Sequence, residues 1–460
     1  MSKLKIIEEI EKNLPVENIE SDGMQIWPFL RIYFGNLLIS NLGAVDININ
    51  ILKSFFCSFY YGFFNLFRSY DYIIFSGSSE RKMINNQLHD KSIDFISKSL
   101  NKTLVFELPI PFHYPKKDIP TKYIVSKFIL YLFILIRSKL FYKAPKINNE
   151  QLLRDILSKH NVKLDYKSLI KKHLAQYKLM SLLIRIYKPK AVFFVCSYTN
   201  MAFIKALKDK GIKVIEIQHG VINNNHLAYN LYKKLDSNFY PDYLLTFGKK
   251  ERDVFAANNF FIKECNVLAV GHLYIDYIAG TYPGDNKFKT LIAGYKKAVA
   301  ITADGVPLDT TTIEFLNKAA QIDKTIIYIY IPRNKFTKKV FSFNENIKVV
   351  DWLNCYEIMA QCDFHSTVYS TCALEAPSIG VQNILINLNN LSKMNYHSVL
   401  NNEEITRYVS TPEEYVETIN NFKIQEKKYI INTNKDVIVP GYKENIKGIL
   451  NLILDYKISN

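Results

Sequence analysis

The segment with the clearest chemical potential is Gln218-His219-Gly220, which directly follows the mostly apolar run 214–217. A short run rich in β-branched residues predicts a strand, and we expect Gly220 to turn the chain away at its carboxyl end. An imidazole at that position can take a proton from an attacking hydroxyl group. His219 is therefore the candidate general base, and the alternative is a plain polar contact in a loop.

Hydroxyl-bearing residues gather after another expected strand, at 362–364. The set is Ser366, Thr367, Ser370 and Thr371. Glu375 lies one turn into the helix that should follow. Free N–H groups at a helix N-terminus bind phosphate, and a carboxylate accepts hydrogen bonds from the hydroxyl groups of a sugar. The segment predicts a site for a diphosphate and its attached sugar, with an ordinary N-cap as the alternative.

Two further groups of residues also directly follow expected strands. Arg333 and Lys335 come after one strand and could neutralise phosphate charge. Gly271, His272 and Asp276 come after a strand of the first series and should line the ligand cleft beyond the strand ends. Isolated residues of these types are more often surface charges or structural contacts, and that is the alternative for each.

A repeated pattern of short apolar runs and helix-length stretches positions these residues, and it is typical of parallel α/β units. Strands are expected first at 72–75, 104–106, 191–195, 214–217, 243–246 and 267–270. A second series is expected at 298–302, 325–331, 348–350, 362–364 and 383–386. We therefore predict an α/β protein with two doubly wound lobes.

The pattern also divides the chain. We predict an N-terminal helical segment at 1–69, a first Rossmann-like lobe at 70–280, a second at 297–425 and a C-terminal helical segment at 426–460. Gly, Pro and Asn between the lobes interrupt the rhythm, as a connection would. Ligands of such sheets bind beyond the carboxyl ends of the strands, so the two lobes should face a central cleft.

Composition and missing motifs exclude several classes of protein. Of 460 residues, 48% are hydrophobic and 22% are charged, which excludes wholesale disorder. The sequence has no dinucleotide fingerprint, P-loop, H-E-x-x-H or G-x-S-x-G motif, and no D-x-D cluster. We therefore expect no cofactor and no metal site.

The charge indicates anionic partners, because 59 Lys and Arg against 43 Asp and Glu give a net charge of +16. Two apolar segments, 52–67 and 123–136, are too short to span a membrane. The second lies among cations, with Asp118 the only acid between Lys116 and Lys146. It is either a helix lying on an anionic leaflet or a buried core helix with a basic rim, and the two are compatible.

The segments 218–220, 271–276 and 366–380 together resemble the GT-B glycosyltransferases of bacterial capsule and lipopolysaccharide biosynthesis. This group is similar in motif to the CDP-glycerol glycerophosphotransferases and the polysialyltransferases. The resemblance covers roughly residues 190–390. It implies two facing Rossmann-like lobes, with the acceptor bound mainly by the first and a nucleotide-activated donor mainly by the second.

Individual residues match the motifs of this family. His219 matches a histidine that acts as general base or binds the acceptor, and Arg333 resembles a basic residue that meets the donor phosphate. Ser370, Thr371 and Glu375 match the donor-binding segment. Pro377 departs from the pattern and should kink the helix or delay its start.

The resemblance implies transfer of a sugar from a nucleotide-sugar donor to a glycan or lipid-linked acceptor, without a cofactor. The N-terminus lacks the apolar stretch of a secretory signal, so we expect a cytoplasmic protein. A basic, aromatic-rich first lobe suits a lipid-linked acceptor at the membrane. We therefore expect the protein to be peripheral on the inner face of the membrane and to have no nucleic-acid partner. One alternative is transfer of glycerol phosphate from a CDP-activated donor, and a sugar-nucleotide 2-epimerase ranks below it. A non-catalytic, basic membrane- or nucleic-acid-binding protein is the alternative from another class.

Overall fold

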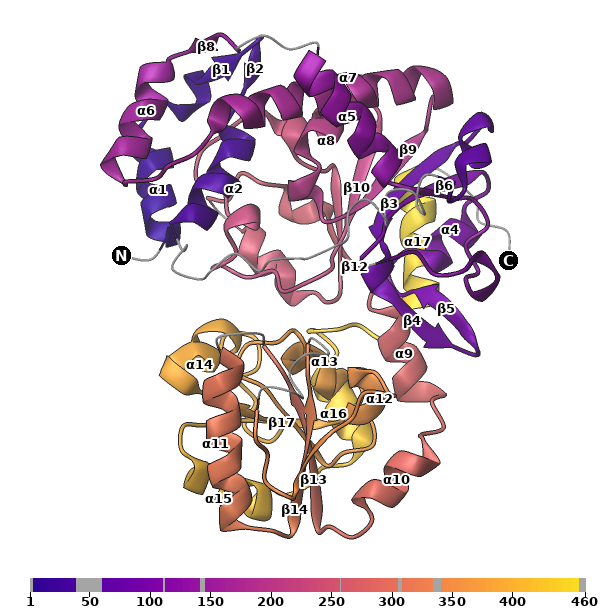
Figure 1. Cartoon of the computed structure of the whole chain (residues 1–460), viewed down its shortest axis with the longest axis vertical. Helices are drawn as coiled ribbons and strands as arrows, with labels where there is room; N and C mark the ends of the chain where they lie inside the picture. The colour runs from indigo at the N-terminus through magenta and orange to yellow at the C-terminus, as the bar shows by residue number, and fades with distance from the viewer. Residues whose placement is uncertain are drawn as a thin grey trace. The chain divides into compact units, whose positions relative to one another are not determined.

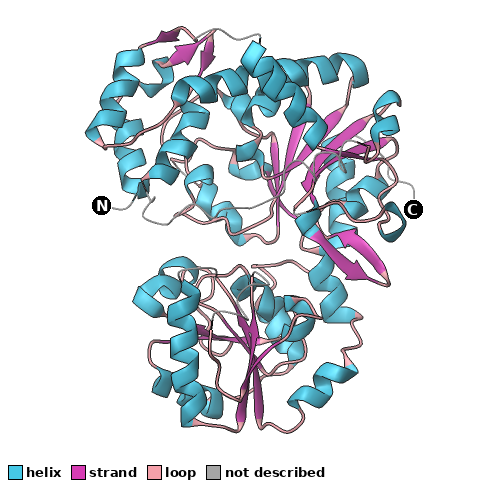
Figure 2. Cartoon of the chain, viewed as in Figure 1, coloured by secondary structure: helices cyan, strands magenta, loops and turns pink. Residues whose placement is uncertain are grey.

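A computed structural model of the chain describes residues 3–38, 60–110, 112–140, 145–256, 258–304, 308–333 and 341–454. The chain forms two compact units (Figures 1 and 2). Unit 1 comprises Met1–Thr246, Glu251–Val270 and Lys443–Asn460, and unit 2 comprises Phe247–Lys250 and Gly271–Tyr442. The segment predicted as 1–69 thus belongs to the same unit as the first sheet. The segment predicted as 426–460 is divided, because the chain returns to unit 1 at Lys443.

Unit 1 is built on a seven-stranded parallel sheet of order β12-β11-β10-β9-β3-β6-β7. Its strands are β3 (Tyr72–Gly77), β6 (Thr103–Leu108), β7 (Ile124–Ser126), β9 (Ala191–Val195), β10 (Lys213–Ile217), β11 (Tyr243–Thr246) and β12 (Val267–Ala269). The chain moves outward from β3 in one direction and from β9 in the other, so the order reverses between β3 and β9. Such a reversal is where doubly wound sheets bind their ligands.

Helices cover both faces of this sheet (Figure 1). They are α1 (Lys3–Asn13), α2 (Trp27–Leu37), α4 (Asp94–Ser99), α5 (Phe128–Leu140), α6 (Glu150–Lys159), α7 (Tyr166–Tyr187), α8 (Met201–Lys208) and α17 (Tyr442–Leu454). One core lies between the sheet and α5, α7 and α8. A second core joins α1, α2 and α6 to residues of β11 and β12. Helix α7 begins at its N-cap Asp165, whose carboxylate accepts a hydrogen bond from Ser168 N, and it ends just before Pro189.

Short strands complete unit 1. Strands β1 (Glu20–Ser21), β2 (Met24–Gln25) and β8 (Ile147–Asn148) form a small antiparallel sheet, and β4 (Arg81–Ile84) pairs with β5 (Gln87–Asp90) as a hairpin. The segment predicted as one apolar helix at 123–136 is divided instead. Its first residues form the buried β7, because Ile124 and Val125 are β-branched and pair with β6, and only the rest is helical.

Unit 2 contains a six-stranded parallel sheet of order β15-β14-β13-β16-β17-β18. Its strands are β13 (Lys297–Thr302), β14 (Ile326–Ile331), β15 (Ile347–Val349), β16 (Phe364–Ser366), β17 (Gln382–Ile386) and β18 (Thr406–Val409). The order reverses between β13 and β16. The doubly wound parallel sheets expected from the sequence are thus confirmed in both units. Strand β16 begins two residues later than predicted, and β18 was not predicted.

The helices of unit 2 lie before, between and after these strands. They are α9 (Leu273–Gly280), α10 (Asn286–Ile292), α11 (Leu308–Ile322), α12 (Cys355–Met359), α13 (Cys372–Ser378), α14 (Leu391–Tyr396), α15 (Pro412–Asn421) and α16 (Lys427–Thr433). Helix α10 lies between the two predicted lobes, in the part of the chain that the sequence pattern marked as a connection. Among the described residues of both units, no helix is long and apolar enough to cross a membrane. Residues 52–59 of the first apolar segment lie outside the described part of the chain.

Candidate functional site

Gln218 fixes the turn that follows β10. Its backbone N–H donates to Leu245 O, and its buried side-chain amide donates to Gly220 O at 2.9 Å and to Glu251 Oε1 at 3.0 Å. Gly220 does not have a positive φ, and a Cβ built there would meet no atom within 4 Å. The turn at Gly220 therefore uses no backbone conformation that favours glycine, and the Gln218 amide holds the chain there.

His219 lies directly after this strand with its imidazole largely buried. Its Nε2 is 3.4 Å from Tyr198 Oη, and its Nδ1 makes no hydrogen bond to any described residue. Burial lowers the pKa of His219 below the ordinary value, while the carboxylate of Glu80 raises it to a smaller extent and Lys91 lowers it. The imidazole is therefore neutral at pH 7 and can accept a proton.

One neighbour of His219 comes from the carboxyl end of the adjacent strand β9, and a buried carboxylate lies on β10 itself. Tyr198 belongs to the loop that follows β9, and its ring centre is 6.0 Å from that of His219. Glu216, fully buried on β10, accepts hydrogen bonds from Ser197 N at 3.0 Å and from Tyr229 Oη at 2.9 Å. Burial raises the pKa of Glu216. Sequence reasoning missed both Tyr198 and Glu216, although the polar run 196–200 after a strongly predicted strand was a usable signal.

In unit 2 a partly buried carboxylate bridges the two strands at which the sheet order reverses. Asp304 follows β13, and its carboxylate accepts hydrogen bonds from Tyr369 N at 2.7 Å and Val368 N at 3.3 Å, both in the loop after β16. Thr367 Oγ1 lies 3.0 Å from Asp304 Oδ1 and 2.9 Å from Thr302 O. Burial raises the pKa of Asp304 to about 6. Asp304 was not predicted, although it follows an expected strand.

Arg333 joins this cluster from the carboxyl end of β14. Its Nη1 donates to the backbone oxygen of Asp304 at 3.2 Å, and its side chain is exposed. The structure thus brings Arg333, Asp304 and Thr367 together at adjacent strand ends. Lys335 lies outside the described residues.

The predicted hydroxyl groups are not equivalent. Ser366 is fully buried, and its Oγ accepts a hydrogen bond of 2.7 Å from Tyr415 Oη within the core, so it is turned away from solvent. Ser370 and Thr371 are partly exposed at the start of α13. Ser370 Oγ is 3.4 Å from Cys372 N, and the Thr371 side chain makes no capping hydrogen bond.

Glu375 lies on the buried side of α13 and does not face solvent. It is 2% exposed, its Oε1 accepts a hydrogen bond of 2.9 Å from Tyr356 Oη, and its Oε2 makes no hydrogen bond with any described residue. Pro377 is part of the same helix and lacks the N–H that would bond to Ala373 O. Asn383 Nδ2 donates to that oxygen at 2.7 Å instead, so the helix includes the proline.

Gly271, His272 and Asp276 lie at the start of α9 and have structural contacts. Gly271 has a φ of +88°, and a Cβ there would lie 2.2 Å from Val439 O. The His272 Nδ1 atom accepts a hydrogen bond from Ile275 N and so caps the helix. Asp276 Oδ2 accepts a hydrogen bond of 2.7 Å from Tyr442 N. These three residues fix the helix and the returning chain.

A buried histidine makes unit 2 sensitive to acid. His365 on β16 lies 2.9 Å from Thr302 Oγ1 and 2.8 Å from Asn383 Oδ1, and burial lowers its pKa to about 4. As the pH falls from about 6.5 to 4, the unfolded chain takes up a proton that the folded imidazole does not. This residue should therefore cost unit 2 about 3 kcal/mol of stability over that range.

Urea unfolding followed by the fluorescence of Trp352, in a Trp27→Phe background, measures this effect. His365→Asn should remove that part of the pH dependence whatever it costs at pH 7, since the amide carries no charge. An equal pH dependence in the variant would assign the acid sensitivity to another group.

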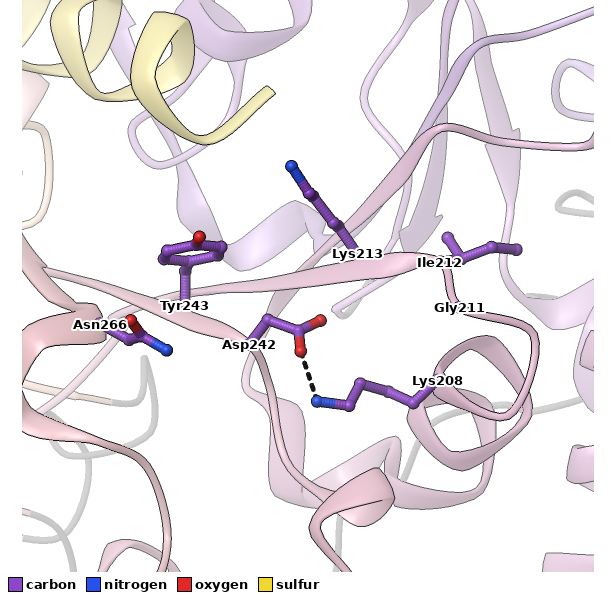
Figure 3. Close-up of a pocket in the computed structure, with 7 residues that line it drawn as sticks. All are labelled: Lys208, Gly211, Ile212, Lys213, Asp242, Tyr243 and Asn266. Carbon is purple, nitrogen blue, oxygen red and sulfur yellow. Dashed lines mark hydrogen bonds and ion pairs between the residues drawn. The ribbon is translucent and has the colours of Figure 1, made fainter. Parts of the chain in front are cut away.

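Two further features of the structure concern metal binding and a hollow away from these residues. Among the described residues, no group of three or more His, Cys, Asp or Glu side chains could hold a metal ion. A hollow of about 260 Å³ lies at the amino ends of β10, β11 and β12 (Figure 3). It is lined by Lys208, Gly211, Ile212, Lys213, Asp242, Tyr243 and Asn266. Because His219 follows the carboxyl end of β10, the hollow lies at the opposite edge of the sheet.

Comparisons with known proteins identify the fold. No protein-family model matches the sequence, and no curated protein matches it. A putative UDP-N-acetylglucosamine 2-epimerase from Listeria monocytogenes matches in structure with a TM-score of 0.50 and 10% identity, over 85% of this chain and 99% of that chain. The glycotransferase of kitacinnamycin matches with a TM-score of 0.50 and 13% identity, over 83% and 99%.

The calicheamicin glycosyltransferase matches with a TM-score of 0.50 and 11% identity, over 84% of this chain and 99% of that chain. Each match spans both units and nearly the whole of the other chain. At these identities the likeness concerns the fold. Together with the two doubly wound parallel sheets, it shows that the chain has the GT-B fold.

Proposed function

We propose that the chain is a glycosyltransferase that moves a sugar from a nucleotide-activated donor to a growing surface polysaccharide or a lipid-linked acceptor. The observation that carries the proposal is the cluster of Asp304, Thr367 and Arg333 where the sheet order of unit 2 reverses. Ligands of doubly wound sheets bind at this point. The partly buried Asp304 carboxylate accepts two backbone hydrogen bonds from the loop after β16 and holds its shape, which favours a preorganised ligand site.

In this proposal unit 2 binds the donor. The Arg333 guanidinium, exposed beside the cluster, pairs with the diphosphate, and the hydroxyl groups of Ser370 and Thr371 donate to it. Tyr369 is 53% exposed in the same loop and offers a planar face to the nucleobase. Glu375 is too deeply buried to meet a sugar directly, so we assign it to the support of α13 through Tyr356.

Unit 1 binds the acceptor and removes its proton. The neutral His219 imidazole takes the proton of the acceptor hydroxyl as that oxygen forms a bond to the anomeric carbon. The bond from that carbon to the phosphate oxygen breaks, and the nucleotide leaves with the electron pair. Arg333 stabilises the negative charge that develops on the phosphate. The reaction needs neither a cofactor nor a metal, and it would take place in the cytoplasm, where nucleotide-sugars are made.

A second candidate activity is supported by one comparison. A protein named as a putative 2-epimerase matches this chain with the same TM-score as the two named glycosyltransferases. An epimerase inverts one carbon centre of the sugar and releases a nucleotide-sugar as its product, so it needs no acceptor. Polyol-phosphate transfer from a CDP-activated donor differs from both in the released nucleotide, which is CMP.

Thermal shift with CMP, CDP, UDP, GDP and dTDP tests the donor site. We expect one of them to stabilise the protein, by about 2.7 kcal/mol at one hundred times its Kd. Arg333→Ala should weaken this nucleotide at least tenfold, because a charge-assisted pair to phosphate is lost. Arg407→Ala is the matched control, since Arg407 is an exposed cation of unit 2 that pairs with Glu403.

The outcomes separate the candidates. If no nucleotide stabilises the wild type, or if Arg333→Ala binds as the wild type does, the proposed donor site is wrong. Once the nucleotide is known, the corresponding nucleotide-sugar is incubated with the protein alone. Conversion of the sugar to its epimer without an acceptor would identify an epimerase and contradict the transferase.

A further inference from the structure

Unit 1 exposes large apolar side chains on three neighbouring elements. On α5 they are Tyr131 (36% exposed), Phe133 (54%), Leu135 (47%) and Ile136 (42%). On α7 they are Leu182 (49%) and Ile186 (58%), and on the short helix η2 (Phe63–Phe67) they are Phe64 (82%) and Phe67 (75%). Single exposed apolar residues are common, but a group of this size marks a surface that contacts something apolar.

These residues share one face of unit 1. Buried residues of α5 and α7 enter the same core against one face of the sheet, so the exposed sides of both helices point away from that face. The two helices pack directly on each other (Figure 1). Tyr187 Oη at the end of α7 donates to Leu66 O of η2 at 2.7 Å, which places η2 beside α7. We call this the α5–α7 face.

The charged side chains of α5 and α7 are all cations. Residues 119–149 contain no Asp or Glu, and neither do residues 166–190, which contain seven Lys and Arg. At the chain's average of 43 acids in 460 residues, these 56 residues would carry about five. The exposed cations on the two helices are Arg137, Lys139, Lys167, Lys172, Lys178 and Arg185, of which Lys167 pairs with Glu150. On α7, Lys178, Leu182, Arg185 and Ile186 follow helical spacing, so cations and apolar side chains share one stripe.

We propose that the α5–α7 face docks on an anionic phospholipid bilayer. The aromatic and aliphatic side chains enter the interfacial zone, and the cations meet the lipid phosphates. Helix α5 has 13 residues, a length of about 20 Å, so it lies on the bilayer and does not cross it. A protein partner with an acidic surface would match the cations but would leave Phe64, Phe67 and Phe133 without an apolar environment. The proposal is independent of the nucleotide site in unit 2.

Co-sedimentation of the full chain with vesicles tests the electrostatic part. We expect binding to vesicles of phosphatidylglycerol and phosphatidylcholine, much weaker binding to phosphatidylcholine alone, and loss of binding at high salt. Arg137→Gln with Lys139→Gln should lower the partition coefficient about 30-fold, at about 1 kcal/mol for each cation near the surface. Lys318→Gln with Lys324→Gln, two exposed cations of unit 2, is the matched control and should change little.

A second pair of variants tests the apolar part. Phe64→Ser with Phe67→Ser should weaken vesicle binding at least tenfold without lowering the melting temperature, because these side chains are exposed in the free protein. Met394→Ser, at a residue of unit 2 that is 61% exposed, is the control. Light scattering of the lipid-free protein shows whether a second copy covers the face.

Three results would overturn the proposal. The first is wild-type affinity for anionic vesicles in both pairs of variants, and the second is no affinity of the wild type for them. The third is a lipid-free dimer that the phenylalanine variants convert to a monomer, which would assign the face to a second copy of this chain. Nucleotide binding should be unchanged in every variant, so a failure here is distinguishable from a failure of the proposed donor site.

Discussion

His219→Ala is expected to lower kcat for sugar transfer by about 10²- to 10⁴-fold, the usual contribution of a general base. The buried imidazole is neutral at pH 7 because desolvation lowers its pKa, and its Nδ1 makes no hydrogen bond to any described residue. It can therefore accept a proton without first breaking a strong contact. Nucleotide binding should stay within about twofold of the wild type, since the proposed donor residues belong to unit 2. Initial rates with saturating donor, together with the nucleotide thermal shift, measure both quantities.

The pH profile separates a base from a merely structural residue. In the wild type, kcat/KM should rise with pH through the lowered pKa of His219 and become level above about pH 6.5. In His219→Ala this acid limb should vanish from the residual activity. His397→Ala, at an exposed histidine of unit 2, is the control and should keep both the rate and the limb. A full rate in His219→Ala, or an unchanged acid limb, would remove His219 from the chemistry.

The arrangement of both sheets follows from local patterns in the sequence. Strands such as β9 and β14 are continuous runs of apolar and aromatic residues, which is how fully buried parallel strands appear in a sequence. Strand β7 was harder to recognise, because its three residues run directly into the apolar helix α5. Strand β18 gives a weak signal because only its end residues are buried, so it is not a continuous apolar run.

The candidate residues were predictable as positions but not as orientations. Ser366 and Thr367 are neighbours in the sequence, yet Ser366 bonds to Tyr415 in the core while Thr367 bonds to Asp304 at the strand end. Successive side chains of a strand point to opposite faces, and the sequence does not say which face is covered. The bridge from Asp304 to Tyr369 joins residues more than sixty positions apart, and a single sequence carries no signal for such a contact.

The sequence of the segment 22–31 indicates no chemical role, and the structure shows what it does. Its last residue, Arg31, is fully buried and donates to Leu227 O at 2.9 Å and to Asn230 O at 2.7 Å. Glu11 on α1 is also fully buried and pairs with Arg31 Nε. The two N-terminal helices therefore hold the loop that leads away from His219. This explains why they belong to unit 1 and do not form a segment of their own.

Breaking this buried pair should have the largest effect on stability. Arg31→Leu leaves the Glu11 carboxylate uncompensated in the core, which typically costs 3–5 kcal/mol, or about 4 kcal/mol at the middle of that range. The loss should appear in unit 1, because both partners and their contacts lie there. The chain has two tryptophans, and Trp27 donates to Glu11 Oε1 at 3.1 Å. Urea unfolding followed by Trp27 fluorescence in a Trp352→Phe background therefore reports on this cluster.

A double-mutant cycle distinguishes the ion pair from general packing. Glu11→Leu with Arg31→Leu removes both charges, so the double variant should be more stable than the sum of the two single losses predicts, by about 2 kcal/mol. It should still be less stable than the wild type, because Tyr232 N and the backbone oxygens of Leu227 and Asn230 lose their partners. Arg154→Leu, which breaks an exposed pair with Glu150, should change the stability little. Strictly additive losses in the cycle would show that Glu11 and Arg31 act independently, and the loop after His219 would then depend on packing and not on this pair.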